Sequence, residues 1–231
     1  MLSQAEWEAI RISAQVAGLA LSGILIPGIA VAWLMARRAF PGKVVLDGLL
    51  HLPLVLPPVA VGYLLLISLG PNGKAGQLLH HLAGIELAFQ WTGAALAAGI
   101  MAFPLLVRSL RLSFEAVDPG LEATALTLGA SPWRVFITIS LPLALPGLLT
   151  GSLLAFARAL SEFGATITFA ANIPGETRTL PLALYTAIQS PGGEAAAARL
   201  CASAVVIALL ALTASELLAR RMRRRLAGRD H

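Results

Sequence analysis

The sequence predicts an all-α protein that crosses a membrane about five times. Of its 231 residues, 57% are hydrophobic and only 13% are charged, whereas about a quarter of the residues in a soluble domain carry a charge. The mean hydropathy of +0.79 indicates that apolar surface must face lipid rather than fill a core. A single cysteine, Cys201, leaves no disulfide framework within the chain.

Five stretches are apolar and long enough to form membrane-spanning helices, which need about 20 residues each. They are residues 12–35, 49–69, 87–107, 137–157 and 200–219. Proline removes a hydrogen bond from a helix interior, so we expect breaks or kinks in the first, second and fourth of these spans. The residues concerned are Pro27, Gly28, Pro53, Pro57, Pro58, Pro142 and Pro146. Such breaks could be packing kinks, or they could line a pathway through the membrane.

Basic residues predict the orientation, because short cytoplasmic loops are enriched in lysine and arginine. They gather after the first, third and fifth spans: Arg37, Arg38, Lys43, Arg108, Arg111, Arg134 and the arginine-rich tail 220–231. We therefore expect the amino terminus outside, the carboxyl terminus in the cytoplasm and one transmembrane domain over residues 1–231. The tail is interpreted as a cytoplasmic anchor rather than a nucleic-acid-binding surface, because it directly follows a span.

Residues 118–142 connect the third and fourth spans and contain two helix starts. Asp118 can cap a helix that begins with Pro119, and Ser131 can cap one that begins with Pro132. Gly129 lies between them, where a helix commonly ends on a left-handed residue. This coupling segment, 118–142, is predicted to form a helix, a glycine turn and a second helix in the cytoplasm, where it would dock on a partner.

The coupling segment resembles the EAA motif of binding-protein-dependent ABC importers. Residues Gly129, Ile139, Leu141 and Pro142 have the spacing of that motif, whereas Glu122 lies seven residues before Gly129 instead of six. The resemblance implies a coupling helix that sits in a groove of an ATPase subunit, and the displaced Glu122 leaves its role there open. The docking residues that it implies are Glu122, Ala123, Ala125, Gly129, Ala130, Trp133, Arg134, Phe136, Ile139, Leu141 and Pro142.

Physical properties of the segment suit docking. Its small residues would let two backbones approach closely, and Trp133 and Phe136 offer the aromatic anchors that are enriched at interface hot spots. Arg134 could pair with an acidic rim on the partner. The alternative is an amphipathic helix that lies on the membrane surface with Trp133 at the lipid–water boundary.

Residues 161–200 resemble the corresponding segment of molybdate ABC transporter permeases, and they resemble sulfate permeases more loosely. The resemblance implies a homodimer in a bacterial inner membrane, two ATPase subunits and an external molybdate-binding protein. The chain lacks the phosphate-binding pattern GxxxxGK[ST], so ATP and Mg would be bound by the ATPase. The chain itself is expected to be a non-catalytic subunit without a cofactor. Tungstate or sulfate remains an alternative substrate.

The path of a tetrahedral oxyanion should offer hydroxyls, backbone N–H groups and positive charge. Arg158 and Glu162 stand four residues apart, so they can face each other on one helix. They could contact the substrate, or they could form a self-neutralising pair that only packs the helix end. The candidate pathway residues are Pro57, Pro58, Arg158, Glu162, Gly164, Thr166, Thr168 and Arg178.

Other classes of function find little support in the sequence. The four histidines have no companions at metal-ligand spacing, and His80 and His81 are expected in a solvated turn. A secondary transporter would need an ion-coupling site and usually internal repeats. An intramembrane enzyme would need a nucleophile and base or a metal set, and none is evident.

Overall fold

The computed structural model describes residues 2–227 of the chain, without the side chains of Ser215, Glu216 and residues 218–227. Within this range the chain forms α-helices and one π-helical turn, and no strand, so the all-α prediction is confirmed. The side chains of the predicted basic tail, 220–231, all lie outside the described part of the structure.

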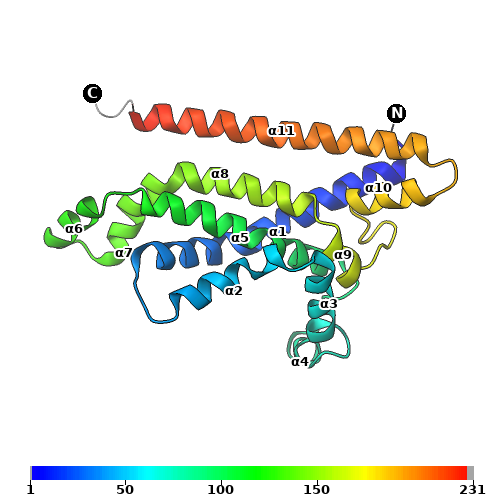
Figure 1. The fold of residues 1–231 in the computed structure, drawn as a ribbon, viewed down its shortest axis with the longest axis horizontal. Coiled ribbons are helices and arrows are strands. Elements are labelled where there is room, and N and C mark those ends of the chain that lie inside the picture. Colours follow the sequence, from blue (N-terminus) through cyan, green and yellow to red (C-terminus); the bar gives the residue numbers. More distant parts are fainter. Residues whose placement is uncertain (1, 228–231) are drawn as a thin grey trace.

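Five helices run along the long axis of the molecule in alternating directions (Figure 1). They are α1 (Gln4–Arg37), α2 (Lys43–Val55), α5 (Trp91–Glu115), α8 (Leu141–Leu160) and α11 (Glu194–Ala227). Short elements join them: α3 (Pro58–Leu69), α4 (Lys74–Ala83), α6 (Pro119–Thr127), α7 (Pro132–Val135), the π-helix η1 (Phe136–Ser140), α9 (Gly164–Phe169) and α10 (Leu180–Gln189). α6 and α7 lie at the end of the molecule that the last turns of α11 also reach.

Among the described residues, four helices are long and apolar enough to cross a membrane, and a fifth span exists if α2 and α3 count as one broken span. The two are bent by 109° where they meet. α2 has 13 residues, which gives it a length of about 20 Å, less than the roughly 30 Å of a hydrocarbon core. The second predicted span is therefore broken near Pro57, and the prediction of about five spans agrees with the structure.

Proline breaks the helices less often than the sequence predicts. α1 continues through Pro27 and Gly28, so the predicted break in the first span is wrong. One proline removes one hydrogen bond, and the turns on both sides keep theirs. Gly28 also serves packing, since a Cβ atom there would lie 2.8 Å from Leu106 Cδ2 of α5.

α5 is the centre of the bundle, with α1 and α8 packed against it. Its small side chains, among them Ala94, Ala98 and Ala102, are fully buried. Small residues let membrane helices approach closely. On α8, Gly147 lies so near α5 that a Cβ atom would overlap Ser113, and Ser109 Oγ donates a hydrogen bond of 3.3 Å to the Gly147 carbonyl oxygen.

Polar contacts fix α10 and α11 to α1. Arg199 at the start of α11 pairs with the buried Glu6 of α1 at 2.7 Å. The backbone N–H of Leu180, which begins α10, donates to Ser13 Oγ of α1 at 2.6 Å. The first half of α1 therefore holds the beginnings of both α10 and α11.

Candidate functional site

The coupling segment has the local structure that its sequence predicts. The Asp118 carboxylate accepts a hydrogen bond of 2.8 Å from the Gly120 N–H at the start of α6. Ser131 Oγ accepts one of 3.3 Å from the Arg134 N–H at the start of α7. Both predicted caps are confirmed, and each is followed by a proline at the first helical position.

Gly129 ends α6 in the left-handed conformation, with φ of +87°. Its N–H donates to the Leu126 carbonyl at 3.0 Å, and the Ala130 N–H donates to the Ala125 carbonyl at 3.1 Å. These two bonds satisfy carbonyls that the end of a helix leaves without partners. The predicted order of helix, glycine turn and helix is confirmed.

The second half of the segment contains a feature that the sequence did not predict, the π-helix η1. The Leu141 N–H reaches back five residues to the Phe136 carbonyl, a widened turn of a kind that often marks functional sites. Pro142, the next residue, has no N–H to donate. Ile139, Leu141 and Pro142 thus lie at the junction where the coupling segment becomes α8.

Glu122 points into the protein rather than toward a partner. Its Oε1 atom accepts hydrogen bonds from Arg37 Nε at 3.1 Å, Arg37 Nη2 at 2.9 Å and Ser140 Oγ at 2.6 Å. Arg37 Nη2 also donates to the Val117 carbonyl at 3.0 Å. The side chains of Arg37 and Glu122 are only 13% and 16% exposed. We call this set, Arg37, Val117, Glu122 and Ser140, the Arg37 clamp.

Sequence reasoning missed Arg37 and Ser140 as members of the site. The sequence pattern related Arg37 only to the orientation of the chain, as one of the basic residues that follow the first span. It lies 85 positions before Glu122, and no local pattern links residues at that separation.

Aromatic side chains connect the coupling segment to the bundle. Phe136 is half-buried, and its ring centroid lies 5.5 Å from that of Trp33, 5.4 Å from that of Trp133 and 6.2 Å from that of Phe114. Trp133 stacks on Phe136 and remains 69% exposed. Trp133 is therefore the more accessible of the two predicted anchors.

The accessible face of the segment combines small and apolar residues. Leu128, which sequence reasoning did not select, is 84% exposed beside the Gly129 turn. The other predicted docking residues divide into exposed ones, namely Ala123, Gly129, Arg134 and Pro142, and half-buried ones, namely Ala125, Ala130, Ile139 and Leu141. An apolar groove of about 640 Å³ runs between this segment and α1, lined by residues that include Trp33, Pro132 and Trp133.

Several predicted pathway residues meet where α3 packs on α9. Pro58 begins α3, and a Cβ atom on Gly164 of α9 would lie only 2.8 Å from Pro58 Cβ. A Cβ atom on Gly62 would lie 2.9 Å from Thr168 Cβ. Glycine on both helices thus permits a contact that larger residues would prevent. Pro57 precedes this contact at the bend between α2 and α3.

Arg158 and Glu162 face each other as predicted, with Arg158 Nη1 2.6 Å from Glu162 Oε2. The Glu162 side chain is 2% exposed, whereas that of Arg158 is 25% exposed. Glu162 Oε1 also accepts a hydrogen bond of 2.9 Å from the Ala165 N–H in α9. The pair therefore joins the end of α8 to the beginning of α9.

The two remaining pathway candidates have different surroundings. Thr166 is fully buried, and its hydroxyl has no hydrogen-bond partner among the described residues. Arg178 Nε donates to Asn172 Oδ1 at 2.9 Å, and Asn172 Nδ2 donates to Thr186 Oγ1 at 2.9 Å. Arg178 is thus held in a network of its own between the loop before α10 and α10 itself.

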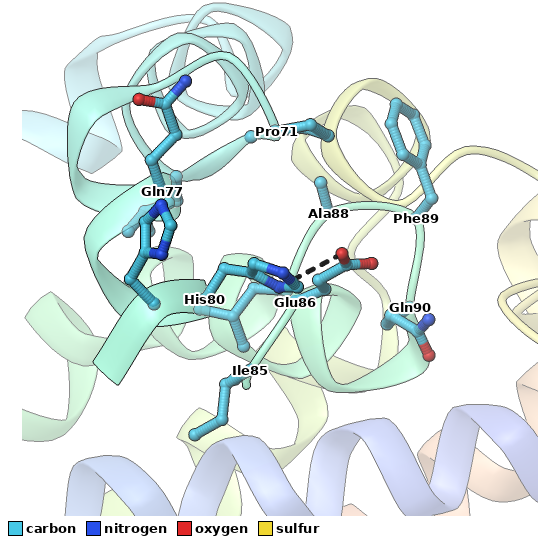
Figure 2. A pocket seen from close by; sticks show the side chains of 13 residues that line it. Pro71, Gln77, His80, Ile85, Glu86, Ala88, Phe89 and Gln90 are labelled. Carbon is cyan, nitrogen blue, oxygen red and sulfur yellow. Dashed lines mark ion pairs between the residues drawn. The ribbon is translucent and has the colours of Figure 1, made fainter. Parts of the chain in front are cut away.

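A cavity of about 260 Å³ lies between α4 and the loop that precedes α5, and none of the predicted site residues lines it. In Figure 2 His80 and Glu86 lie side by side at one wall of this cavity, with His80 Nδ1 3.3 Å from Glu86 Oε1. His80 and His81 lie on α4, so their predicted turn is wrong, although both are exposed. Among the side chains that the structure describes, no group of three or more His, Cys, Asp or Glu residues could hold a metal ion.

A larger, polar cavity of about 580 Å³ lies at the other end of the molecule from the coupling segment. Glu8, Arg11 and Gln15 of α1 line it together with Gly175 and Glu176. The last two belong to the run that resembles molybdate permeases.

Comparisons with known proteins agree on one family. Residues 28–224 match the family described as binding-protein-dependent transport system inner membrane component. The chain is 58% identical over 229 residues to the molybdenum transport system permease protein ModB of Escherichia coli (strain K12), which covers 99% of this chain and 100% of that protein. It is 53% identical over 221 residues to the protein of the same name from Haemophilus influenzae, covering 96% of each.

The fold is also similar to that of a solved structure. A bacterial ABC transporter involved in the import of the acidic polysaccharide alginate superimposes with a TM-score of 0.72 over 96% of this chain and 80% of that chain. At 19% sequence identity, this likeness describes the fold alone.

Proposed function

Because the chain belongs to the inner membrane components of binding-protein-dependent transport systems, among the molybdenum transport permeases, we propose that it forms the membrane passage of an ABC importer for molybdate. The observation that carries the proposal is the identity of 58% over 99% of the chain. Transport is driven by ATP hydrolysis in a separate ATPase subunit, which binds the ATP and Mg. The chain itself is the multi-pass membrane subunit.

In this proposal the coupling segment faces the cytoplasm and the amino terminus faces outward. The alternating directions of α1, α2, α5, α8 and α11 support it, because an odd number of passes carries the chain from one side to the other. The positions of Arg37, Arg108 and Arg111 near the coupling end support the same orientation by the positive-inside rule.

The partners follow from this orientation. Two copies of the chain form a homodimer with the pathway between them, and an ATPase subunit docks on each coupling segment. A molybdate-binding protein delivers the ion at the outer end, where the polar cavity lined by Glu8 and Arg11 lies. The cluster around Arg158, Gly164 and Thr168 contributes charge and N–H or hydroxyl donors to the pathway, in keeping with an anion that carries no proton to donate.

Docking on the coupling segment gives a first testable prediction. Replacing the exposed Trp133 by alanine removes the largest accessible apolar side chain of α7. Truncation of an aromatic hot spot costs about 2 kcal/mol, so the affinity of the ATPase subunit should fall roughly 30-fold. Binding of the purified ATPase to the permease in lipid nanodiscs measures the effect.

Trp7 provides the matched control for this experiment. It is 60% exposed and lies at the start of α1, far along the chain from the coupling segment. Trp7→Ala should bind the ATPase as the unmodified permease does. Equal affinity for Trp133→Ala and Trp7→Ala would show that the ATPase docks elsewhere.

The proposed substrate is tested in bacteria that lack their own molybdate permease. Expression of this chain together with its ATPase and binding protein should restore cellular molybdenum at a low external concentration, as measured by mass spectrometry. A parallel strain that lacks sulfate permeases tests the alternative. Restored growth on sulfate without restored molybdenum would reject molybdate as the substrate.

A further inference from the structure

Beyond its docking surface, the coupling segment contacts α1 through the Trp33–Phe136 ring pair and through the hydrogen-bonded side chain of Arg37. We propose that Arg37 is a positioning residue that transmits the movement of the coupling segment into α1. This inference rests on the proposed function, because it concerns the coupling of ATP hydrolysis to transport. In this role Arg37 touches neither ATP nor the transported ion.

The hydrogen bonds of the Arg37 clamp join several elements of the fold at one place. Arg37 lies in the last turn of α1, and two of its nitrogens donate to Glu122 of α6 at 3.1 Å and 2.9 Å. The same side chain donates to the Val117 carbonyl, in the link from α5 to α6, at 3.0 Å. Ser140 at the end of η1 donates to the same carboxylate oxygen at 2.6 Å. α1, α6, η1 and the end of the α5 region therefore meet at one point.

The clamp has the properties of a rigid connection. Hydrogen bonds between charged groups are about twice as strong as neutral ones, and the planar guanidinium holds its donors in a fixed geometry. Ion pairs on an open surface contribute little, because water screens them. Here both side chains are largely covered, at 13% and 16% exposed, so the screening is weaker.

Through Arg37, a movement of the coupling segment can reach α1 as well as α8, the helix that follows the segment in the chain. The coupling segment continues directly into α8 through η1, whereas α1 is 85 residues away and joined to α6 only by contacts. At its other end α1 binds the starts of α11 and α10 through Glu6 and Ser13. A movement of α6 that pulls on Arg37 is therefore carried along α1 to the opposite end of the molecule.

The test measures molybdate transported per ATP hydrolysed in vesicles that contain the permease, its ATPase and its binding protein. Arg37→Gln should lower this ratio at least 10-fold while the ATPase still binds and hydrolyses ATP. Arg37→Lys keeps the charge and one donor nitrogen, and should recover a large part of the ratio. Arg38→Gln is the matched control, because Arg38 is the exposed neighbour and should transport as the unmodified protein does.

A second measurement reports directly whether Arg37 holds the end of α1 against α6. Spin labels at the exposed positions Ala39→Cys and Leu126→Cys, in a Cys201→Ser background, report the distance between the end of α1 and α6. We expect one narrow distribution with Arg37, a broad one with Arg37→Gln and an intermediate one with Arg37→Lys. This measurement needs no transport, so it tests the clamp even if the ion carried is not molybdate.

The outcomes separate the two proposals. An unmodified complex that moves no molybdate with ATP would contradict the proposed function alone. An unchanged transport ratio in Arg37→Gln, or an equally narrow distance distribution, would overturn the role of Arg37. Parallel loss of ATPase binding and of transport in Arg37→Gln and Arg37→Lys alike would also overturn it, since the clamp would then only maintain the docking surface.

Discussion

The double variant Arg158→Gln/Glu162→Gln is expected to assemble normally and to lose molybdate uptake about 10-fold, which corresponds to roughly 1.4 kcal/mol of charge stabilisation. The Arg158 side chain is 25% exposed, whereas its partner Glu162 is 2% exposed. The arginine is thus the accessible member of the pair and can present positive charge to an anion. Uptake of labelled molybdate into vesicles measures the effect.

The double variant is used because the single variant Arg158→Gln would remove the positive charge and also destabilise the protein. Removing only Arg158 leaves the buried Glu162 without its partner, and breaking a buried ion pair costs about 3–5 kcal/mol. Glutamine at position 162 keeps an acceptor for the Ala165 N–H, which Glu162 now provides at 2.9 Å. Arg108→Gln, at an exposed position of α5, is the control. Normal uptake by the double variant would favour a pair that only packs the helix end.

Replacement of Gly147 by leucine is expected to abolish the folded permease. A Cβ atom at this position would overlap Ser113 Oγ, and it would come within 2.4 Å of Ser113 Cβ. The Cβ atom of Ser113 is fixed by the backbone of α5, so α5 and α8 would have to separate. Even Gly147→Ala should lower stability, because overpacking of a core costs about 1–3 kcal/mol.

Thermal unfolding of the purified variants measures this effect. For a chain of this length, about 1 kcal/mol changes Tm by roughly 2–4 °C. Gly23→Ala in α1 is the matched control, since a Cβ atom there meets nothing within 4 Å. A Gly147→Ala protein with the Tm of Gly23→Ala would contradict the close packing of α5 on α8.

Features that depend on neighbours in the sequence could be predicted from it. The caps at Asp118 and Ser131 and the turn at Gly129 each involve residues two to five positions apart. The Arg158–Glu162 pair is separated by one helical turn. Each of these contacts joins residues within about one helical turn of each other. The residue types and their spacing in the sequence were therefore enough to predict it.

Features that depend on packing could not be predicted in this way. The bend of 109° between α2 and α3 accompanies a close contact of Gly62 with Ala165, which is about a hundred residues later in the chain. Pro27 was expected to break α1, but it lies within a continuous helix beside Gly28, which packs on Leu106. The Arg37 clamp likewise joins residues that lie far apart in the sequence, and no repeating sequence pattern links them.

The most direct test of the proposed function is molybdate accumulation in vesicles that contain the permease, its ATPase and its binding protein. We predict accumulation that requires ATP and all three components, and that a large excess of sulfate leaves nearly unchanged. Accumulation without ATP or without the ATPase would contradict an ABC importer. Accumulation that sulfate suppresses, with sulfate itself transported, would contradict molybdate as the substrate.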